Sequence, residues 1–446
     1  MRRVLASLPA TSAVAAALAV VASAAWVRLG TIVLAAAALA ALGLVVVARQ
    51  SDVATLLLPL CLLPYALNVG GLFMSISDLL VLGLAGCLLL GGLGAGNARS
   101  FAGPLTIPAA GFVAWTLASA VWSASPRAAV IEAVQRLEFV VFGVAVMAAL
   151  PVDGRQARRA LVGLVTGAAV LGVTTVIVGV VEHRYVGVYP VGLHKNAAGS
   201  LLSYGLLAAL GIKLAMTPTG WKARWLATGS LATLAGLVLT GSRGAWVGTV
   251  VAAAAVVALR RPQLAWPTAS VTVVLVALFF LLVPPEVASR KAGFGEQFST
   301  ATVRAETWQD GVEAIVANPL LGVGAGNFIT HFSEHSAQGD PNNLFLLTWA
   351  ETGLPGLALL AWFLGATLAL ARRTARALPA REVPAAANLA GAALLITAVV
   401  HAQFDLFWTR GTGLAAFLGA GLVVWAARAV APMTPASRPG RLIEVR

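Results

Sequence analysis

The sequence predicts an all-α polytopic membrane protein with about 12 to 14 transmembrane helices and one long, partly helical extracytoplasmic loop. Of its 446 residues, 59% are hydrophobic and only 11% are charged, whereas a soluble domain has about 25% charged residues. Much of the apolar content lies in continuous runs of about 18 to 22 residues, the length that a helix needs to cross a bilayer. Membrane-spanning strands are not expected, because their sequences alternate between apolar and polar residues.

The apolar runs define fourteen candidate spans, eleven before a long loop at 285–353 and three after it. These spans are 5–27, 31–48, 54–72, 76–94, 104–122, 129–149, 160–181, 196–214, 223–240, 244–260, 267–284, 354–372, 384–404 and 410–428. The chain is accordingly divided into N-terminal spans at 1–182, a core with the long loop at 183–357, C-terminal spans at 358–430 and a cytoplasmic tail at 431–446.

The basic residues predict the orientation of the spans. With the N-terminus inside, 20 of the 30 Lys and Arg residues fall in inner segments and 10 in outer segments. This bias agrees with the positive-inside rule and makes both termini cytoplasmic. The long loop, which carries eight of the 17 acidic residues, then lies outside.

The composition argues against two other kinds of site. The net charge of +13 comes from basic residues scattered singly or in pairs between apolar runs, so it predicts membrane topology and no nucleic-acid partner. Cys61 and Cys87 lie inside apolar runs, where cysteine is a small core residue. None of the five histidines forms a close His/Cys cluster, so no metal site is predicted.

Arg243 is the most informative residue of the chain. It lies in the turn Thr240-Gly241-Ser242-Arg243-Gly244, which separates two apolar runs with almost no room for a loop and faces outward in the predicted topology. A guanidinium is always charged and offers a fork of donors that suits phosphate oxygens. The turn therefore indicates an anionic lipid head group on the outer face, although an arginine that only snorkels from a helix end is the alternative.

The long loop predicts an amphipathic helix at 303–317. Val312, Ile315 and Val316 form its apolar face, and Trp308 lies one turn before Val312. An Asn-Pro pair ends the helix.

Two later segments of the loop also have a defined pattern. Gly322, Gly324 and Gly326 alternate with other residues, which favours a tight packing turn, with a phosphate-binding nest as the alternative. Further on, Asn342 is placed to cap a short apolar helix that Gly353 ends.

Two more outer turns contain charged residues. The turn at 182–196 brings Arg184 and Lys195 to one predicted outer mouth, where they either contact a ligand or anchor helix ends at the interface. The last outer turn contains Asp405, whose role the sequence leaves open.

Three motifs resemble the O-antigen ligase and polymerase superfamily, the ligase/Wzy C-terminal domain group. The first is Gly241-Ser242-Arg243-Gly244-Ala245, and the second is Arg304 with Trp308 leading into Asn318-Pro319-Leu320-Leu321-Gly322-Val323-Gly324. The third runs from Asn343-Leu344 to Glu351-Thr352-Gly353-Leu354-Pro355-Gly356. The turn from Gly187 to Asn196-Ala197 also fits, and the resemblance is strongest over 184–357.

The resemblance implies a reaction on the outer face of the bacterial cytoplasmic membrane. A glycan carried on a polyprenyl diphosphate is transferred to an acceptor sugar hydroxyl without a cofactor, and polyprenyl diphosphate is released. Because negative charge grows on the leaving diphosphate, fixed cations at the outer interface would stabilise the transition state. The expected catalytic residues are Arg243, Arg304, Asn342 and His335, and the expected substrate-binding residues are Arg184, Lys195, Asn196, His331, Asn343 and Glu351.

The chain departs from the superfamily pattern at one position. Asn342 stands where the superfamily has a histidine. The resemblance implies that this histidine activates the acceptor hydroxyl. An amide has no useful basicity, so it cannot take over this role. His331 and His335 lie a few residues upstream and could replace the histidine. Alternatively, this member works without a general base or uses another acceptor.

The sequence leaves several functions open. An O-antigen ligase-like glycosyltransferase is the leading expectation, followed by a polymerase that extends the lipid-linked glycan and a non-catalytic relative that binds the glycan lipid. A lipid or polysaccharide transporter is disfavoured, because the charges cluster at span ends rather than near span centres. The fold is expected, by analogy alone, to be similar to that of class C glycosyltransferases.

Overall fold

The computed structural model describes residues 66–69, 72–75, 103–140, 143–144, 154–282, 300–329, 340–379, 382–405 and 411–430. Several predictions lie outside these residues: the spans at 5–27, 31–48 and 76–94, most of the span at 54–72, His331, His335 and the tail at 431–446.

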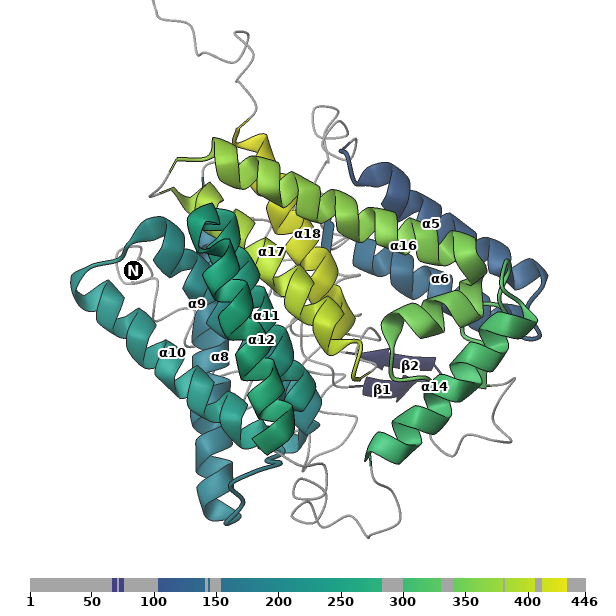
Figure 1. The fold of residues 1–446 in the computed structure, drawn as a ribbon, viewed down its shortest axis with the longest axis horizontal. Coiled ribbons are helices and arrows are strands. Elements are labelled where there is room, and N and C mark those ends of the chain that lie inside the picture. The colour runs from purple at the N-terminus through teal and green to yellow at the C-terminus, as the bar shows by residue number, and fades with distance from the viewer. Residues whose placement is uncertain are drawn as a thin grey trace, which may run out of the picture.

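The described residues are overwhelmingly helical (Figure 1). The helices are α5 (Thr106–Ala118), η3 (Ser119–Val121), α6 (Pro126–Phe139), α8 (Arg155–Val181), η5 (Pro190–Gly192), α9 (Lys195–Met216), α10 (Gly220–Thr240), α11 (Arg243–Arg260), η6 (Pro262–Leu264), α12 (Ala265–Leu282), α14 (Thr300–Ala317), α16 (Leu344–Ala377), α17 (Val383–His401) and α18 (Gly411–Arg428). The predicted spans from 104–122 onward coincide with these helices to within a few residues, where they are described. The all-α class is therefore confirmed.

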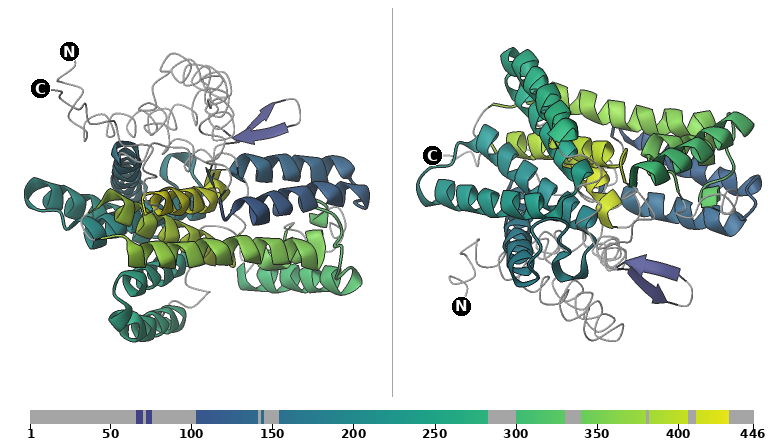
Figure 2. Two further views of the ribbon diagram at one scale, coloured as in Figure 1. Left: turned by 90° about the horizontal axis from the view of Figure 1, so that it is seen from above. Right: turned by 60° about the horizontal axis from the view of Figure 1, so that its bottom comes forward.

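One hairpin is an exception to the helical class. Strands β1 (Ala66–Val69) and β2 (Leu72–Ser75) pair antiparallel, with Val69 opposite Leu72, and lie at the edge of the molecule (Figure 2). The predicted span at 54–72 is therefore wrong at its end. The dipeptide between the strands is Gly-Gly, which is typical of two-residue hairpin loops and which the apolar-run criterion does not detect.

Helix α17 lies at the centre of the bundle. It packs against α18, α9, α11 and α16, and its small side chains allow these neighbours to approach closely. Gly248 of α11, for example, lies against Thr397, where a Cβ atom would be 2.7 Å from the threonine hydroxyl. Because α17 contacts so many helices, the position of its end is tightly constrained.

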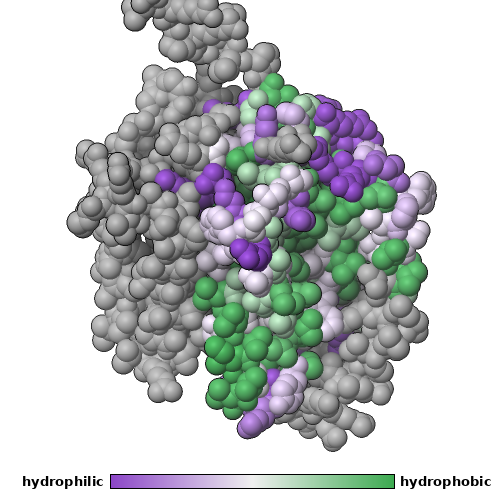
Figure 3. Space-filling model, turned by 90° about the vertical axis from the view of Figure 1, so that its left-hand side faces the viewer, coloured by the Kyte–Doolittle hydropathy of each residue, from purple (hydrophilic) through white to green (hydrophobic). Residues whose placement is uncertain are grey.

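Five of the described helices are long and apolar enough to cross a membrane: α8, α9, α11, α16 and α17. Figure 3 shows the side of the molecule on the left of Figure 1, where apolar residues cover the lower part of the surface and hydrophilic residues gather towards the top. Side chains such as Ile177 on α8 and Leu231 on α10 are exposed, as lipid-facing residues would be. These features agree with a multi-pass membrane protein.

The structure corrects the expected cap of α16. Asn343, not Asn342, is the capping residue, and its side chain accepts hydrogen bonds from the backbone N–H groups of Phe345 at 3.0 Å and Leu346 at 3.1 Å. Gly353 interrupts the helix with φ 67° and ψ −174°, as the sequence predicted. The predicted boundary between residues 357 and 358 falls inside the second half of this helix and stays a prediction.

Helix α14 forms where it was expected, but a different face is buried. Ala314 and Ile315 pack towards α16, whereas Val312 and Val316 are exposed. Gly311 lies on the same buried side, next to Pro341 and Leu346. The apolar periodicity identified the helix but not the side that packs.

A cation-lined cavity at the end of the bundle

A cavity of about 250 Å³ lies where α9 and α11 begin and α17 ends. Residues from five separate segments line it: His194, Lys195, Asn196, Gly241, Arg243, Gly244, Arg304, Asn342, His401, Phe404 and Asp405. Three cations and one carboxylate give this lining a net formal charge of +2 with neutral histidines. Five of the residues predicted for the site, Lys195, Asn196, Arg243, Arg304 and Asn342, are thus brought together.

The turn between α10 and α11 needs both of its glycines. Gly241 ends α10 in the left-handed region with φ 63°, and a Cβ atom there would also lie 2.8 Å from Val186. Gly244 lies under the ring of His401, with which a Cβ atom would collide. The two glycines therefore place Arg243 as the first residue of α11, facing the cavity.

Two helix N-termini point their first turns at this cavity, and each has a cation there. Lys195 begins α9, after the capping residue His194, just as Arg243 begins α11. A helix N-terminus is already the positive end of the helix dipole, so a cation at this position is unfavourable without an anion nearby. The arrangement therefore favours binding of an anion, whose charge both the helix ends and the side chains would balance.

Arg304 brings a third cation from α14. Burial lowers the pKa of Arg304, and the carboxylate of Asp405 opposes this by favouring the charged form. Arg243 lies close enough to Arg304 and Lys195 for mutual electrostatic repulsion. Burial also lowers the pKa of His194, and the charge of Lys195 adds to this effect.

The end of α17 forms the wall opposite these cations. His401 is buried, and its Nδ1 atom lies 2.8 Å from the hydroxyl of Ser200. Four residues later, Asp405 accepts a hydrogen bond from the side-chain amide of Asn196. The backbone N–H of Leu344 donates to the carbonyl of Ala402 at 2.8 Å, which joins this turn to the start of α16.

Four other predicted residues lie elsewhere or outside the described part of the chain. Arg184 is exposed on the 182–196 turn and does not line the cavity, and Asn343 is occupied as the cap of α16. His331 and His335 are not described. Sequence reasoning assigned no role to His401 or Asp405, and the only available signal was two ionisable residues in an apolar outer turn.

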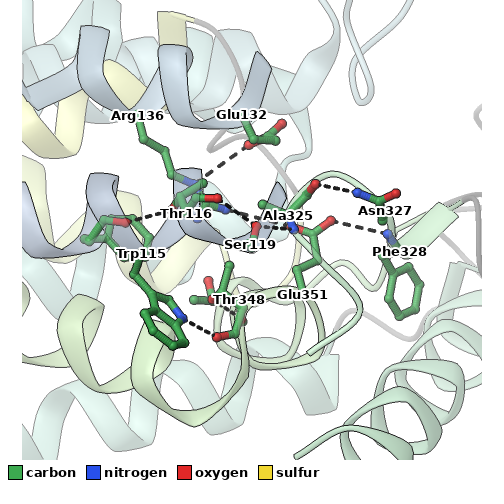
Figure 4. Close-up of polar contacts among 12 residues, drawn as sticks. Trp115, Thr116, Ser119, Glu132, Arg136, Ala325, Asn327, Phe328, Thr348 and Glu351 are labelled. Carbon is green, nitrogen blue, oxygen red and sulfur yellow. Dashed lines mark hydrogen bonds and ion pairs between the residues drawn. The ribbon is translucent and has the colours of Figure 1, made fainter. Parts of the chain in front are cut away.

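Glu351 lies in a second charged cluster, shown in Figure 4. It is buried, and its Oε2 atom is 3.8 Å from Nη2 of Arg136. Arg136 also lies 3.8 Å from Glu132, one helical turn earlier on α6, and donates to the hydroxyl of Thr116 at 2.6 Å. We refer to Glu132, Arg136, Asp340 and Glu351 as the Arg136 network, which borders a cavity of about 160 Å³ that shares no lining residue with the first.

The glycine-rich segment beside this network is a packing turn. Gly322, Gly324 and Gly326 all have positive φ. The backbone N–H groups of Gly324 and Ala325 donate to the carbonyl of Glu351 at 2.8 Å and to the hydroxyl of Ser119 at 3.0 Å. Since these donors are used within the protein, a phosphate-binding nest is not formed here. Among the described residues, no group of three or more His, Cys, Asp or Glu side chains could hold a metal ion.

Comparison with known proteins finds a family model that matches the part of the chain around this cavity. Residues 228–361 match the family model described as O-Antigen ligase. The resemblance to the O-antigen ligase and polymerase superfamily is thereby confirmed. The O-antigen ligase segment contains Arg243, Arg304 and Asn342, but it leaves out Lys195 and Asp405, which complete the cavity.

A curated relative agrees with the match to the O-antigen ligase family. The chain is 30% identical over 271 residues to the exopolysaccharide production protein ExoQ of Rhizobium meliloti (strain 1021). The aligned region covers 54% of this chain and 60% of the relative. The chain is thus similar to a protein of polysaccharide production over somewhat more than half its length.

Proposed function

We propose that the protein transfers a glycan from a polyprenyl diphosphate to an acceptor sugar hydroxyl on the outer face of the bacterial cytoplasmic membrane. The observation that carries this proposal is the convergence of Lys195, Arg243 and Arg304 on one cavity. Three cations from three segments, with two helix N-termini, suit a ligand with at least two negative charges, and a diphosphate has this charge. The match to the O-antigen ligase family supports the same donor class.

In this proposal the cations act on the leaving group. As the bond between the sugar and the diphosphate breaks, negative charge accumulates on the diphosphate oxygen. Arg243 and Arg304 would stabilise this charge in a partly buried place, where screening by water is weak. Asn196 and Asn342 line the same cavity and would contact the sugar or the phosphate oxygens.

The topology proposed from the sequence places the cavity outside. The clusters Arg158–Arg159 and Arg372–Arg373 lie at the start of α8 and near the end of α16. Both are the helix ends far from the cavity, because α8 ends shortly before Lys195 and α16 begins just after Asn342. With the basic end in the cytoplasm, the cavity would open at the outer interface, where a lipid-linked glycan is exposed and the bilayer would hold its polyprenyl chain. Both termini would then be cytoplasmic.

The acceptor decides between two candidate reactions. Transfer to a separate glycolipid or glycan would make the protein a ligase, whereas transfer to a second lipid-linked glycan would make it a polymerase. The similarity to an exopolysaccharide production protein favours the polymerase as the second candidate. Both reactions release polyprenyl diphosphate and use the same leaving-group site.

The test is a transfer assay with the purified protein in lipid nanodiscs. A polyprenyl diphosphate-linked oligosaccharide is mixed with candidate acceptors, and free polyprenyl diphosphate is measured by chromatography. We expect release by the wild-type protein and its loss in Arg243→Ala. Arg260→Ala is the matched control, because this arginine ends the same helix at the opposite side of the bundle and should leave release unchanged.

Binding without release would point instead to a non-catalytic glycan-lipid-binding protein. No binding of the donor by the folded wild-type protein would overturn the proposal.

A further inference from the structure

We propose that Asp405 is the general base that removes the proton from the acceptor hydroxyl. This inference rests on the proposed glycan transfer. It assigns the removal of the acceptor proton to a residue, because the amide of Asn342 has no useful basicity and cannot perform it. It follows from the juxtaposition of Asp405, Asn342 and the cations in one cavity.

The cavity lining offers few proton acceptors. Lys195, Arg243 and Arg304 are cations, so the candidates among the described lining residues are His194, His401 and Asp405. His401 is buried, with Nδ1 at 2.8 Å and Nε2 at 3.5 Å from the hydroxyls of Ser200 and Ser242, so its ring is held in the wall. Asp405 lies outside the helix that ends at His401 and lines the cavity directly.

His194 is the competing candidate. Its Nδ1 atom accepts from the backbone N–H of Asn196 at 3.4 Å, so it acts as the cap of α9. Burial and the charge of Lys195 lower the pKa of His194, which makes the imidazole a weaker base than a free histidine. A carboxylate has a further advantage, because its negative charge also stabilises the positive charge that develops on the sugar in a glycosyl transfer.

The carboxylate of Asp405 is held in a fixed orientation. Its Oδ2 atom accepts from the side-chain amide of Asn196, and its backbone N–H donates to the carbonyl of His401 at 3.1 Å. The hydrogen bond from Leu344 to Ala402 keeps this turn beside residue 342. Asp405 therefore faces the same space as the position where the superfamily has its histidine.

In the proposed transfer step, the proton and the electron pair each have an acceptor. The acceptor oxygen bonds to the anomeric carbon of the donor and gives its proton to the carboxylate of Asp405. The bond between that carbon and the diphosphate oxygen breaks, and its electron pair leaves with the diphosphate, next to Arg243 and Arg304. Asp405 afterwards returns the proton to water. The bound diphosphate itself assists, because a negative charge nearby increases the proton affinity of a carboxylate.

The test uses two substitutions in the full chain in nanodiscs. Asp405→Asn keeps the size and can still accept from Asn196, so we expect the protein to stay folded and to bind donor within a few-fold of wild type. Its kcat should fall by about 10² to 10⁴, the usual contribution of a general base. In that background Asn342→His should restore at least about ten-fold activity, with a pH dependence set by an imidazole near pH 6.5.

Three results would overturn the proposal. Asp405→Asn with wild-type kcat and an unchanged pH profile would show that another group, such as His194, takes the proton. Loss of donor binding in Asp405→Asn that accounts for its loss of activity would show that Asp405 only positions the cations. A folded wild-type protein that releases no polyprenyl diphosphate would remove the underlying reaction, and this outcome is distinct because it precedes any comparison of variants. Asp405→Glu, which keeps the carboxylate, should retain more activity than Asp405→Asn, and donor binding by Asp405→Asn checks that its loss is not caused by misfolding.

Discussion

The cation-lined cavity and the Arg136 network lie near each other in the fold, but their charges are balanced differently. In the network, one guanidinium lies 3.8 Å from each of two carboxylates, and Asp340 adds a third acid nearby. In the cavity, three cations face one carboxylate. The excess of acids in the network can be relieved by a proton, which burial favours at Asp340, whereas the excess of cations in the cavity favours binding of an anion.

Glu351 and Arg243 both belong to motifs that resemble the superfamily, but they lie in different surroundings. Glu351 is buried among partners from α6 and the glycine-rich turn. Arg243 begins a helix with other cations around it. Membership in a motif therefore does not by itself tell which residue would bind a ligand, and the excess of cations around Arg243 is what supports the proposed anion site there.

The largest effect is expected in the Arg136 network. Arg136→Ala leaves Glu351 buried without its cation, which should lower the free energy of unfolding by about 3 to 5 kcal/mol. Thermal unfolding in detergent would measure this loss. Arg127→Ala, on the exposed side at the start of the same helix, is the control and should change the stability little. An equal effect of both substitutions would contradict the structural role of the network.

The next effect concerns the cavity and should appear in activity rather than stability. In the proposed reaction Arg243 would face the leaving group, so Arg243→Ala should lower kcat by about 10² to 10³. The free energy of unfolding should stay the same or rise slightly, because repulsion from Arg304 and Lys195 is relieved. Rates and unfolding curves of the same preparation would be compared. A strongly destabilised Arg243→Ala protein would place Arg243 with the packing residues instead.

A smaller effect on stability is expected from Asp340, the acid of the Arg136 network that has no cation of its own there. Burial, with Glu132 nearby, raises the pKa of Asp340 from 3.8 to about 6. The folded protein thus binds this proton more tightly than the unfolded chain, and stability falls as the pH rises from about 4 through 6, by at most about 3 kcal/mol. Asp340→Asn should remove this decline and raise the unfolding temperature at pH 7.5.

The pH dependence would be measured by thermal unfolding between pH 4.5 and 8. Glu313→Gln, an exposed acid on α14, is the control and should leave the decline in place. A decline that persists in Asp340→Asn would mean that Asp340 is not the group that takes up the proton.

The smallest expected effect on stability distinguishes two neighbouring asparagines. Asn343→Ala removes the side chain that accepts from two backbone N–H groups of α16 and should cost about 1 kcal/mol of stability. Asn342→Ala should have almost no effect on stability, because this residue faces the cavity. Unfolding of both variants under the same conditions measures the difference. A larger loss of stability in Asn342→Ala than in Asn343→Ala would identify Asn342 as the cap.

The sequence by itself determined the membrane class, most of the described helices and the candidate cations. In a bilayer, a long continuous apolar run satisfies the hydrogen bonds of its backbone by forming a helix, so the positions of the helices follow from the positions of these runs. The turn at Arg243 and the break at Gly353 could also be predicted, because a charge between two apolar runs and a glycine at a helix end are local features.

Only the tertiary structure decided which charges meet. Arg304 and Asp405 are about a hundred residues apart in the chain, and Lys195 is about a hundred residues before Arg304, yet the packing of α14, α17 and α9 brings them to one cavity. The packing also places Glu351 next to Arg136 and leaves Arg184 exposed. It buries a face of α14 that the apolar periodicity did not indicate. Charge balance depends on neighbours in space, and a sequence pattern reports neighbours along a single helix.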